Sequence, residues 1–224
     1  MTDKDATHAK LTLEDIYRSH HERGKRYGYL YCHGERGLYL SEWIGKGKTV
    51  LDLGCRDGEL TRFFARGNTV TGADIDRKAL ELARGKYGIE TLWLDLNAEF
   101  PFEKGAFDVV VACEIVEHIY YTNAFLEKVS SILKPGGMFI GSVPNSFRMR
   151  NRLKFLAGKE FDTDQTHVHM FSHDKLKKLL ARYFKDIRIA PIGGKILPFL
   201  KVSKYTPGYL NRLFGRDLLW KAVK

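Results

Sequence analysis

From residue 49 onward the chain alternates short apolar runs with turns and helical stretches, and this alternation constrains the fold more than any other feature of the sequence. The runs are β-branched or otherwise apolar, as strands buried on both faces of a sheet are. They span residues 49–53, 69–73, 91–94, 109–112 and 138–143. Strands that alternate with helices build a parallel sheet with helices packed against it.

Helical spacing of apolar residues fills the intervals between these runs. Helices are expected over residues 59–65, 77–87 and 124–133. The last should stop at Lys134-Pro135-Gly136-Gly137, because proline cannot continue a helix and paired glycines allow a tight return. Residues 11 to about 44 predict two short helices, the first capped by Thr12 with Asp15 three positions later.

After residue 145 the alternation loosens. The sequence predicts a basic helix at 146–157, an amphipathic helix at 173–183, and a sixth and a seventh strand at 186–190 and 218–223. Residues 195–216 lie between those two strands and form a connection that is longer than usual.

The net charge of +10 is concentrated in the last third of the chain. Residues 146–224 contain 18 basic and 6 acidic side chains, a net of +12, whereas residues 1–145 contain 19 basic and 21 acidic ones, a net of −2. Such asymmetry favours an anionic partner, which is nucleic acid, a phosphorylated or lipid-linked substrate, or an acidic membrane surface. The alternative is a solvated basic face that aids solubility.

The cysteines and the N-terminal residues indicate a cytoplasmic protein. Cys32, Cys55 and Cys113 are odd in number and widely spaced, without a pair that suggests a disulfide framework or a zinc site. The start MTDKDATHAK is polar, and the chain has no run of eighteen or more apolar residues. We therefore expect reduced thiols and a cytoplasmic location.

Residues 50–58, VLDLGCRDG, predict a strand that ends in a glycine turn and leads into a helix. Backbone amides in such a turn approach a ligand closely, because Gly54 and Gly58 have no Cβ. Asp74 ends the next strand, sixteen residues beyond Gly58, where an acidic residue can accept both hydroxyls of a ribose. Its alternative role is to cap the following helix, but Asp76 is better placed for that role.

Residues 50–145 resemble the class I S-adenosylmethionine-dependent methyltransferases, and within that class the ubiquinone-type O-methyltransferases and the methyltransferase-like protein of bacterial methionine biosynthesis. Six elements match in order over about 95 residues: the glycine motif, Asp74, Asp95, Phe107-Asp108, Glu114-Ile115-Val116-Glu117-His118 and Leu133-Lys134-Pro135-Gly136-Gly137. The expected fold class is α/β: a Rossmann-like, seven-stranded, mostly parallel sheet with helices on both faces and an antiparallel last strand.

The resemblance implies S-adenosylmethionine as cofactor and assigns its contacts. Gly54, Cys55 and Gly58 would lie under the methionine part, and Asp52 would reach the amino group directly or through water. Asp74 would hold the ribose. The full expected set is Asp52, Gly54, Cys55, Gly58, Asp74, Ile75, Asp95 and the Leu96 amide against the adenine, and Cys113 in the cofactor cleft.

Arg56 departs from the family pattern, which has glycine at this place. A side chain there would crowd the cofactor, or require a positive φ that arginine disfavours, unless it points outward. Arg26, Tyr27 and Arg36 lie in N-terminal helices that commonly cover the cofactor in this family, where an arginine would pair with the cofactor carboxylate. Solvated surface arginine is the alternative for each.

Three histidines are the candidates for a catalytic base. His118 falls at the carboxyl edge of the sheet, and the ordinary pKa of histidine lies near neutrality; packing at the start of a helix is its alternative role. His167 and His169 alternate on a segment placed to cover the cleft. With Asp162 or Asp164 they imitate a metal site, but no fixed ligand spacing supports one, so no metal is expected.

The expected organisation is a single methyltransferase domain over residues 1–224, with an N-terminal helical cap at 1–45, a cofactor-binding core at 46–145 and a basic, substrate-side part at 146–224. The expected activity is O-methylation of a small, anionic or lipid-linked or glycan-linked metabolite, with peripheral membrane contact through residues 195–216. The alternatives are an RNA methyltransferase and a catalytically silent binding or regulatory protein. The oligomeric state and the acceptor are not determined by the sequence.

Overall fold

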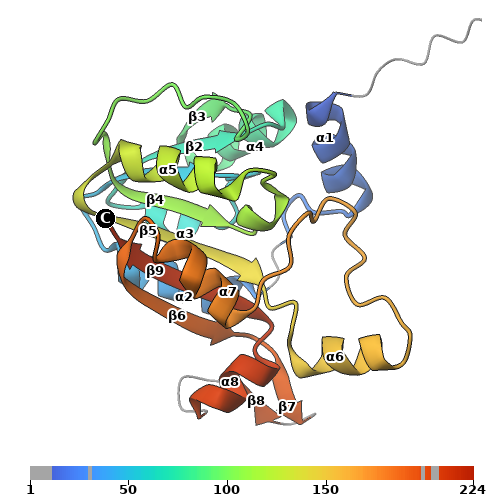
Figure 1. Ribbon diagram of the computed structural model, residues 1–224. Coiled ribbons are helices and arrows are strands. Elements are labelled where there is room, and N and C mark those ends of the chain that lie inside the picture. The colour runs from blue at the N-terminus through green and yellow to red at the C-terminus, as the bar shows by residue number, and fades with distance from the viewer. Residues whose placement is uncertain (1–11, 30–31, 198–199, 203–206) are drawn as a thin grey trace, which may run out of the picture.

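A seven-stranded sheet forms the centre of the computed structural model, which describes residues 12–29, 32–197, 200–202 and 207–224 (Figure 1). Its strands are β1 (Thr49–Leu53), β2 (Thr69–Asp74), β3 (Glu90–Trp93), β4 (Phe107–Cys113), β5 (Leu133–Pro144), β6 (Lys185–Ile192) and β9 (Asp217–Val223). They follow the order β3-β2-β1-β4-β5-β9-β6. Every pairing among β1 to β5 is parallel, and β9 is antiparallel to both neighbours. The expected α/β fold class is confirmed.

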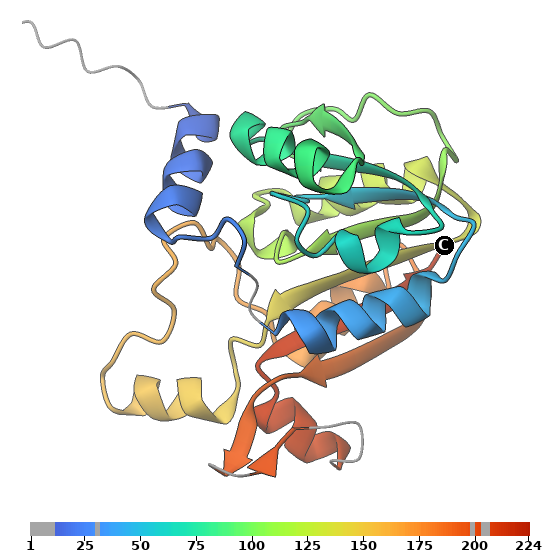
Figure 2. The ribbon, with the colours of Figure 1, turned by 180° about the vertical axis from the view of Figure 1, so that it is seen from behind.

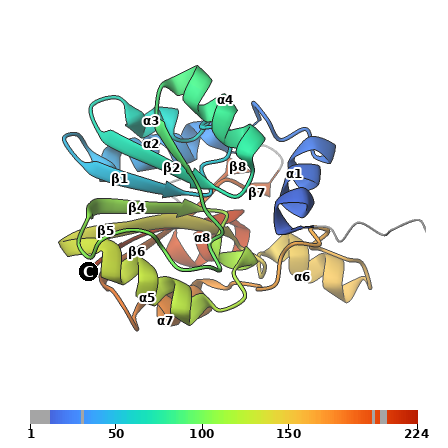
Figure 3. The same ribbon diagram turned by 90° about the horizontal axis from the view of Figure 1, so that it is seen from above.

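Helices cover both faces of the sheet (Figure 3). One face carries α2 (His33–Ile44), α3 (Arg62–Ala65) and α4 (Arg77–Tyr87), and the other carries α5 (Thr122–Ile132) and α7 (His173–Leu180). Successive residues of a strand point to opposite faces, so Val109 and Val111 pack toward the first set while Val110 and Ala112 pack toward the second. A central strand buried on both sides has to be apolar in its buried part, as β4 is from Val109 to Ala112.

Some predicted boundaries were wrong. The helix expected from residue 59 begins only at Arg62, because the residues from 54 to 61 form turns, and the helix expected at 124–133 is shifted to Thr122–Ile132. The turn expected after Leu133 is part of β5, because Leu133 already pairs with Phe107 and an irregularity in the register accommodates the glycines. The predicted helices at 146–157 and 173–183 are shorter, at Met149–Leu156 (α6) and His173–Leu180.

Besides α6, which projects from the body of the molecule, an N-terminal helix, a small hairpin and a helix near the C-terminus lie outside the central layers (Figure 1). The helix α1 (Leu13–Arg23) begins with the predicted Thr12 and Asp15 cap and stands beside the sheet (Figure 2). The predicted connection 195–216 contains a small hairpin, β7 (Lys195–Leu197) and β8 (Leu200–Lys201), and the helix α8 (Gly208–Phe214); residues 198–199 and 203–206 of it lie outside the described residues. Within the described part of the chain, no helix is long and apolar enough to cross a bilayer.

Candidate active site

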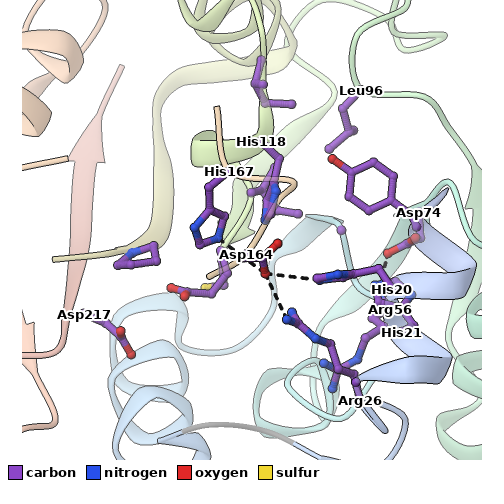
Figure 4. Close-up of a pocket in the computed structure, with 18 of the residues that line it drawn as sticks. His20, His21, Arg26, Arg56, Asp74, Leu96, His118, Asp164, His167 and Asp217 are labelled. Atoms are coloured by element: carbon purple, nitrogen blue, oxygen red, sulfur yellow. Dashed lines mark hydrogen bonds and ion pairs between the residues drawn. The ribbon is translucent and has the colours of Figure 1, made fainter. Parts of the chain in front are cut away.

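A cavity of about 540 Å³ lies at the carboxyl edge of the parallel strands (Figure 4). This volume suits a small-molecule site, and open α/β sheets bind ligands at this edge. The loops after β1 to β5, the helix α1 and the segment around residues 161–167 contribute its walls. The predicted cofactor-binding residues that line it are Asp52, Gly54, Cys55, Asp74, Ile75, Asp95, Leu96 and Cys113.

Gly58 is not among the residues that line the cavity. A glycine is needed at this position for another reason. Both Gly54 and Gly58 have positive φ, +72° and +77°. A Cβ at Gly58 would lie 2.7 Å from the ring of Tyr87, and one at Gly54 would collide with the side chain of Ile115. The backbone of the turn therefore depends on both glycines, but only Gly54 is exposed to a ligand.

Arg56 has a positive φ of +50°, which was one of the alternatives considered for this position. Its side chain is held by Asp57, whose Oδ1 accepts from Nε at 3.0 Å, and by the carbonyl of Tyr29, which accepts from Nη2 at 2.7 Å. The guanidinium thus links the turn after β1 to the connection between α1 and α2.

Two buried carboxylates stand at the ends of neighbouring strands. Asp52 accepts a hydrogen bond from the Thr61 hydroxyl at 2.7 Å, and burial raises its pKa to about 7. Asp74 accepts from the backbone amides of Arg56 and Asp76, at 2.8 and 2.9 Å, and burial raises its pKa. The helix cap considered for Asp74 belongs to Asp76, which accepts from the amide of Ala79.

The remaining strand ends bring polar and apolar groups to the same cavity. Asp95 accepts from the amide of Asn97 at 2.9 Å, which fixes the turn after β3. Cys55 and Cys113 have pKa values raised by burial, that of Cys113 to about 12, so both thiols are protonated at neutral pH. They are therefore not nucleophiles but part of the wall.

His118 and His167 both line the cavity and their rings are in contact, with centroids 4.8 Å apart (Figure 4). The Nδ1 atom of His118 is 3.0 Å from the Thr166 carbonyl oxygen, so this nitrogen carries the proton as donor. The Nδ1 atom of His167 is 2.8 Å from Asp162 Oδ2. The Nε2 atom of each ring points away from these partners, and that of His167 lies 3.8 Å from Asp164 Oδ2. Burial lowers the pKa of His118 to about 4.

Glu117 completes this group, and the sequence did not single it out. Its side chain is buried, and neither carboxylate oxygen has a hydrogen-bond partner among the described residues. Burial and the nearby Glu114 raise its pKa well above the ordinary value. One ligand atom each from Glu117, His118 and His167 lie within 4.8 Å of one another, an arrangement that can hold a metal ion. No metal was expected from the sequence because the histidines with Asp162 or Asp164 have no fixed ligand spacing, and Glu117 was not considered as a ligand.

Backbone hydrogen bonds bring the two halves of this cluster together. The amides of Val168 and His169 both donate to the carbonyl of Glu117, at 2.9 and 3.1 Å. His169 itself does not line the cavity, and its Nε2 lies 3.3 Å from the Tyr120 carbonyl oxygen. Of the three predicted catalytic histidines, the fold thus brings two to the cavity.

The comparisons with known proteins identify the family. A family model described as a methyltransferase domain matches residues 20–183. The chain belongs to the class I S-adenosylmethionine-dependent methyltransferases. A ubiquinone biosynthesis O-methyltransferase of Shewanella pealeana is 30% identical over 145 residues, 61% of each chain, and one of Dinoroseobacter shibae is 39% identical over 113 residues, 46% of each. The chain thus spans about half of the length of these curated relatives.

Solved methyltransferase structures share the fold. A methyltransferase from Thermotoga maritima, described as a possible histamine N-methyltransferase, superposes with a TM-score of 0.71 at 17% identity, covering 93% of this chain and 98% of that one. One from Archaeoglobus fulgidus superposes with a TM-score of 0.68 at 21% identity, covering 94% and 100%. At these identities the likeness extends to the fold alone.

The cofactor of this family is S-adenosylmethionine, and the cavity fits it. The cofactor has an ammonium group and ribose hydroxyls, which are donors, and the cavity presents the buried carboxylates of Asp52 and Asp74 as acceptors. Gly54 lines the cavity and has no side chain, so a ligand can approach its backbone closely. The assignment of Asp52 to the amino group and of Asp74 to the ribose stays a prediction.

The helix α1 and the residues that follow it cover the cavity, and the carboxylates of Asp76 and Asp164 hold them there. Asp76 accepts from the Tyr27 hydroxyl at 2.6 Å and lies 2.8 Å from His21 Nδ1. Asp164 accepts from Arg26 at 3.0 Å and lies 3.4 Å from His20. Arg26 and Tyr27, considered as cofactor contacts or surface residues, help to hold this cover in place, and Arg26 also lines the cavity.

Arg36 is neither solvated nor directed at a free anion. It is 4% exposed and donates to Glu114 at 3.1 Å and to Asp217 at 2.8 Å. Burial acts to lower the pKa of Arg36, but the two carboxylates raise it overall. Burial, with Glu114 beside it, raises the pKa of Asp217 to about 7. The floor of the cavity next to Glu117 therefore holds more carboxylates than cations.

Proposed function

We propose that this protein transfers the methyl group of S-adenosylmethionine to a hydroxyl oxygen of a small anionic or lipid-linked acceptor, and that Glu117, His118 and His167 hold a divalent cation that activates this hydroxyl. The observation that carries the proposal is the convergence of these three side chains beside the cofactor cavity. A cation lowers the pKa of an oxygen that it binds, which favours the nucleophilic form.

The surroundings of the three residues support a cation. An isolated buried carboxylate is costly unless a positive charge neutralises it, and Glu117 has no partner among the described residues. Histidines that bind metals commonly donate the other ring N–H to a carbonyl or a carboxylate, as His118 does to Thr166 and His167 to Asp162. The low pKa of His118 makes it a weak base but keeps it in the neutral form that binds a metal.

Two arginines of the cavity wall support an anionic acceptor. Arg148 and Arg216 line the cavity, together with Asn145, Ser146 and Asn151. Burial and the charge of nearby Arg216 lower the pKa of Arg148, as expected for two cations that face a shared space. The curated relatives named above carry names of O-methyltransferases of ubiquinone biosynthesis, which is consistent with a hydroxyl acceptor.

The protein's part in the reaction is alignment and charge control. When bound, S-adenosylmethionine supplies an electrophilic methyl group and leaves as a neutral thioether. Asp52 and Asp74 hold the cofactor side, and the cluster around Glu117 holds the acceptor oxygen, whose proton passes to water as the oxygen–carbon bond forms. Fixing nucleophile and methyl group in line removes the entropic part of the barrier.

Metal binding and methyl transfer test this proposal together. Calorimetry with Mn²⁺ on chelator-treated protein should show binding that weakens at least tenfold in Glu117→Gln and His167→Ala, but not in the control His173→Ala, whose histidine contacts Asp174 outside the cavity. Transfer of labelled methyl to catechol and to a prenylated catechol should fall on chelation and return with the metal. Equal Mn²⁺ affinity in all variants, or transfer that ignores chelation, would falsify the cation's role.

A further inference from the structure

The helix α6 is oriented with its apolar side toward solvent. Leu153 is 58% exposed and Leu156 is 80% exposed, whereas the polar Asn151 is 8% exposed. Helical periodicity places Leu153 and Leu156 on one face with Met149, and Asn151 on the opposite face. Surface helices of globular proteins ordinarily bury the apolar face, so this arrangement indicates that something other than water covers α6.

Hydrogen bonds keep the polar face of α6 against the protein. The Asn151 amide group donates to the Ser146 carbonyl at 3.0 Å, and its Oδ1 accepts from Arg148 Nε at 3.3 Å. Ser146 in turn exchanges hydrogen bonds with Phe171, at 3.1 and 3.3 Å, and both Ser146 and Asn151 are buried, so the side of α6 that carries Asn151 faces the protein. The exposure of its leucines is therefore built into the structure.

Basic and aromatic side chains surround this apolar face. Arg150, Arg152 and Lys159 are exposed beside it, and Phe147 and Phe155 are 45% and 70% exposed. A shallow groove continues the surface toward the small hairpin and α8. Basic and apolar side chains together form its lining: Met149, Arg150, Leu153, Lys154, Ala157, Lys159, Lys195, Ile196 and Phe214.

We propose that α6 docks this protein on an anionic lipid bilayer, with its leucines and phenylalanines in the interface and its basic residues at the headgroups. Interfacial helices have this composition, with an apolar face flanked by lysine and arginine. Long basic side chains keep their charges at the headgroups while their stems lie on apolar surface. Charge complementarity favours anionic lipid, since residues 146–224 have a net charge of +12.

The position of α6 agrees with a planar partner. The helix stands out from the body of the molecule in two opposite views (Figures 1 and 2). A projecting helix can lie on a flat surface with its exposed apolar face toward that surface. Arg148 and Asn151, at the start of α6, also line the cavity. Docking would therefore place the cavity beside the bilayer, although the docking itself does not depend on the proposed acceptor.

Vesicle flotation tests the proposal. The full chain should float with phosphatidylcholine vesicles that contain 30% phosphatidylglycerol, at least tenfold more than with phosphatidylcholine alone, and less as salt is added. The double variant Leu153→Ser/Leu156→Ser should lose at least tenfold of this binding. The matched control is Leu38→Ser, because Leu38 is a leucine 69% exposed on α2.

A second variant separates docking from misfolding and from other occupants. Arg150→Gln/Arg152→Gln should weaken flotation on anionic vesicles without lowering Tm, and both double variants should bind S-adenosylmethionine as the parent does. Undiminished flotation of both double variants would overturn the proposal, as would an absence of flotation by the parent. A dimer that dissociates in Leu153→Ser/Leu156→Ser, or RNA binding lost with the arginines while vesicles are ignored, would also overturn it.

Discussion

Substitution of Asp74 separates its role in the loop after β1 from its predicted role in binding the cofactor. Its two oxygens accept from the amides of Arg56 and Asp76, at 2.8 and 2.9 Å. Asp74→Asn keeps one acceptor oxygen and removes the charge, but its NH2 group leaves one of the two amides without an acceptor. Asp74→Ala removes the acceptors of both buried amides.

The structure gives a magnitude for each change. Hydrogen bonds from ribose hydroxyls to a charged group contribute about 1.5–3 kcal/mol, so Asp74→Asn should weaken cofactor affinity about 10- to 150-fold. A buried amide left without an acceptor costs about 1–3 kcal/mol, so Asp74→Ala should also lose about 2–6 kcal/mol of stability. For a chain of this size that corresponds to a fall in Tm of roughly 4–24 °C.

Calorimetry with S-adenosylmethionine and its demethylated product, and thermal unfolding without ligand, measure the two effects separately. Asp108→Asn is the matched control, because Asp108 also accepts from a backbone amide, that of Thr49 at 2.9 Å, but at the start of β4 outside the cavity. It should leave affinity unchanged. Parental affinity in Asp74→Asn would refute the ribose contact, and parental Tm in Asp74→Ala would refute the structural role.

Two further predictions concern neighbouring positions. Arg56→Gly should relieve about 1–2 kcal/mol of left-handed strain but remove the 3.0 Å hydrogen bond to Asp57, and a hydrogen bond to a charged group contributes about 1.5–3 kcal/mol. Asp57 keeps its contacts with the Gly28 amide and Lys86, and the added glycine costs about 0.4–1 kcal/mol of chain entropy. Tm should therefore fall; a rise would show that strain dominates. Burial raises the pKa of Asp52 to about 7, so the stability that its retained proton contributes is lost as pH rises from about 4 to 7. Cofactor-free Asp52→Asn should therefore melt near the parent at pH 5 and above it at pH 8. His118, whose pKa is lowered to about 4, has the opposite pH dependence, but both proteins contain it, so it drops out when the two Tm values are subtracted. A difference in Tm that stays constant with pH would contradict the prediction.

The sheet was predictable because its signal is local. Each run of apolar residues is buried on both faces, so burial can be inferred from the run itself. The start of α3 was not predictable in this way. Thr61 donates to Asp52 and the amide of Arg56 donates to Asp74, so contacts with two other strands hold this segment in turns where helical spacing alone favours a helix.

The residues of the candidate site likewise fall into those with a local sequence signal and those that depend on distant contacts. Residues at the strand ends, such as Gly54 and Asp74, were predictable because parallel strands bring their carboxyl ends to one edge. Glu117 was not, although it stands next to His118 in a motif that the family resemblance includes. Its significance depends on burial and on His167, fifty residues later, and no periodicity connects segments so far apart.

The cover over the cavity and the histidine cluster share one carboxylate, so they are coupled. The anchor at Asp76 is the stronger, because its carboxylate is fully buried and contacts both His21 and Tyr27. The anchor at Asp164 is weaker, since the Arg26 side chain is 40% exposed, and exposed ion pairs contribute only about 0–1 kcal/mol. Asp164 also lies 3.8 Å from His167 Nε2. Displacement of α1 on that side therefore changes the charge beside His167, and the position of the cover affects the chemistry of the cluster beneath it.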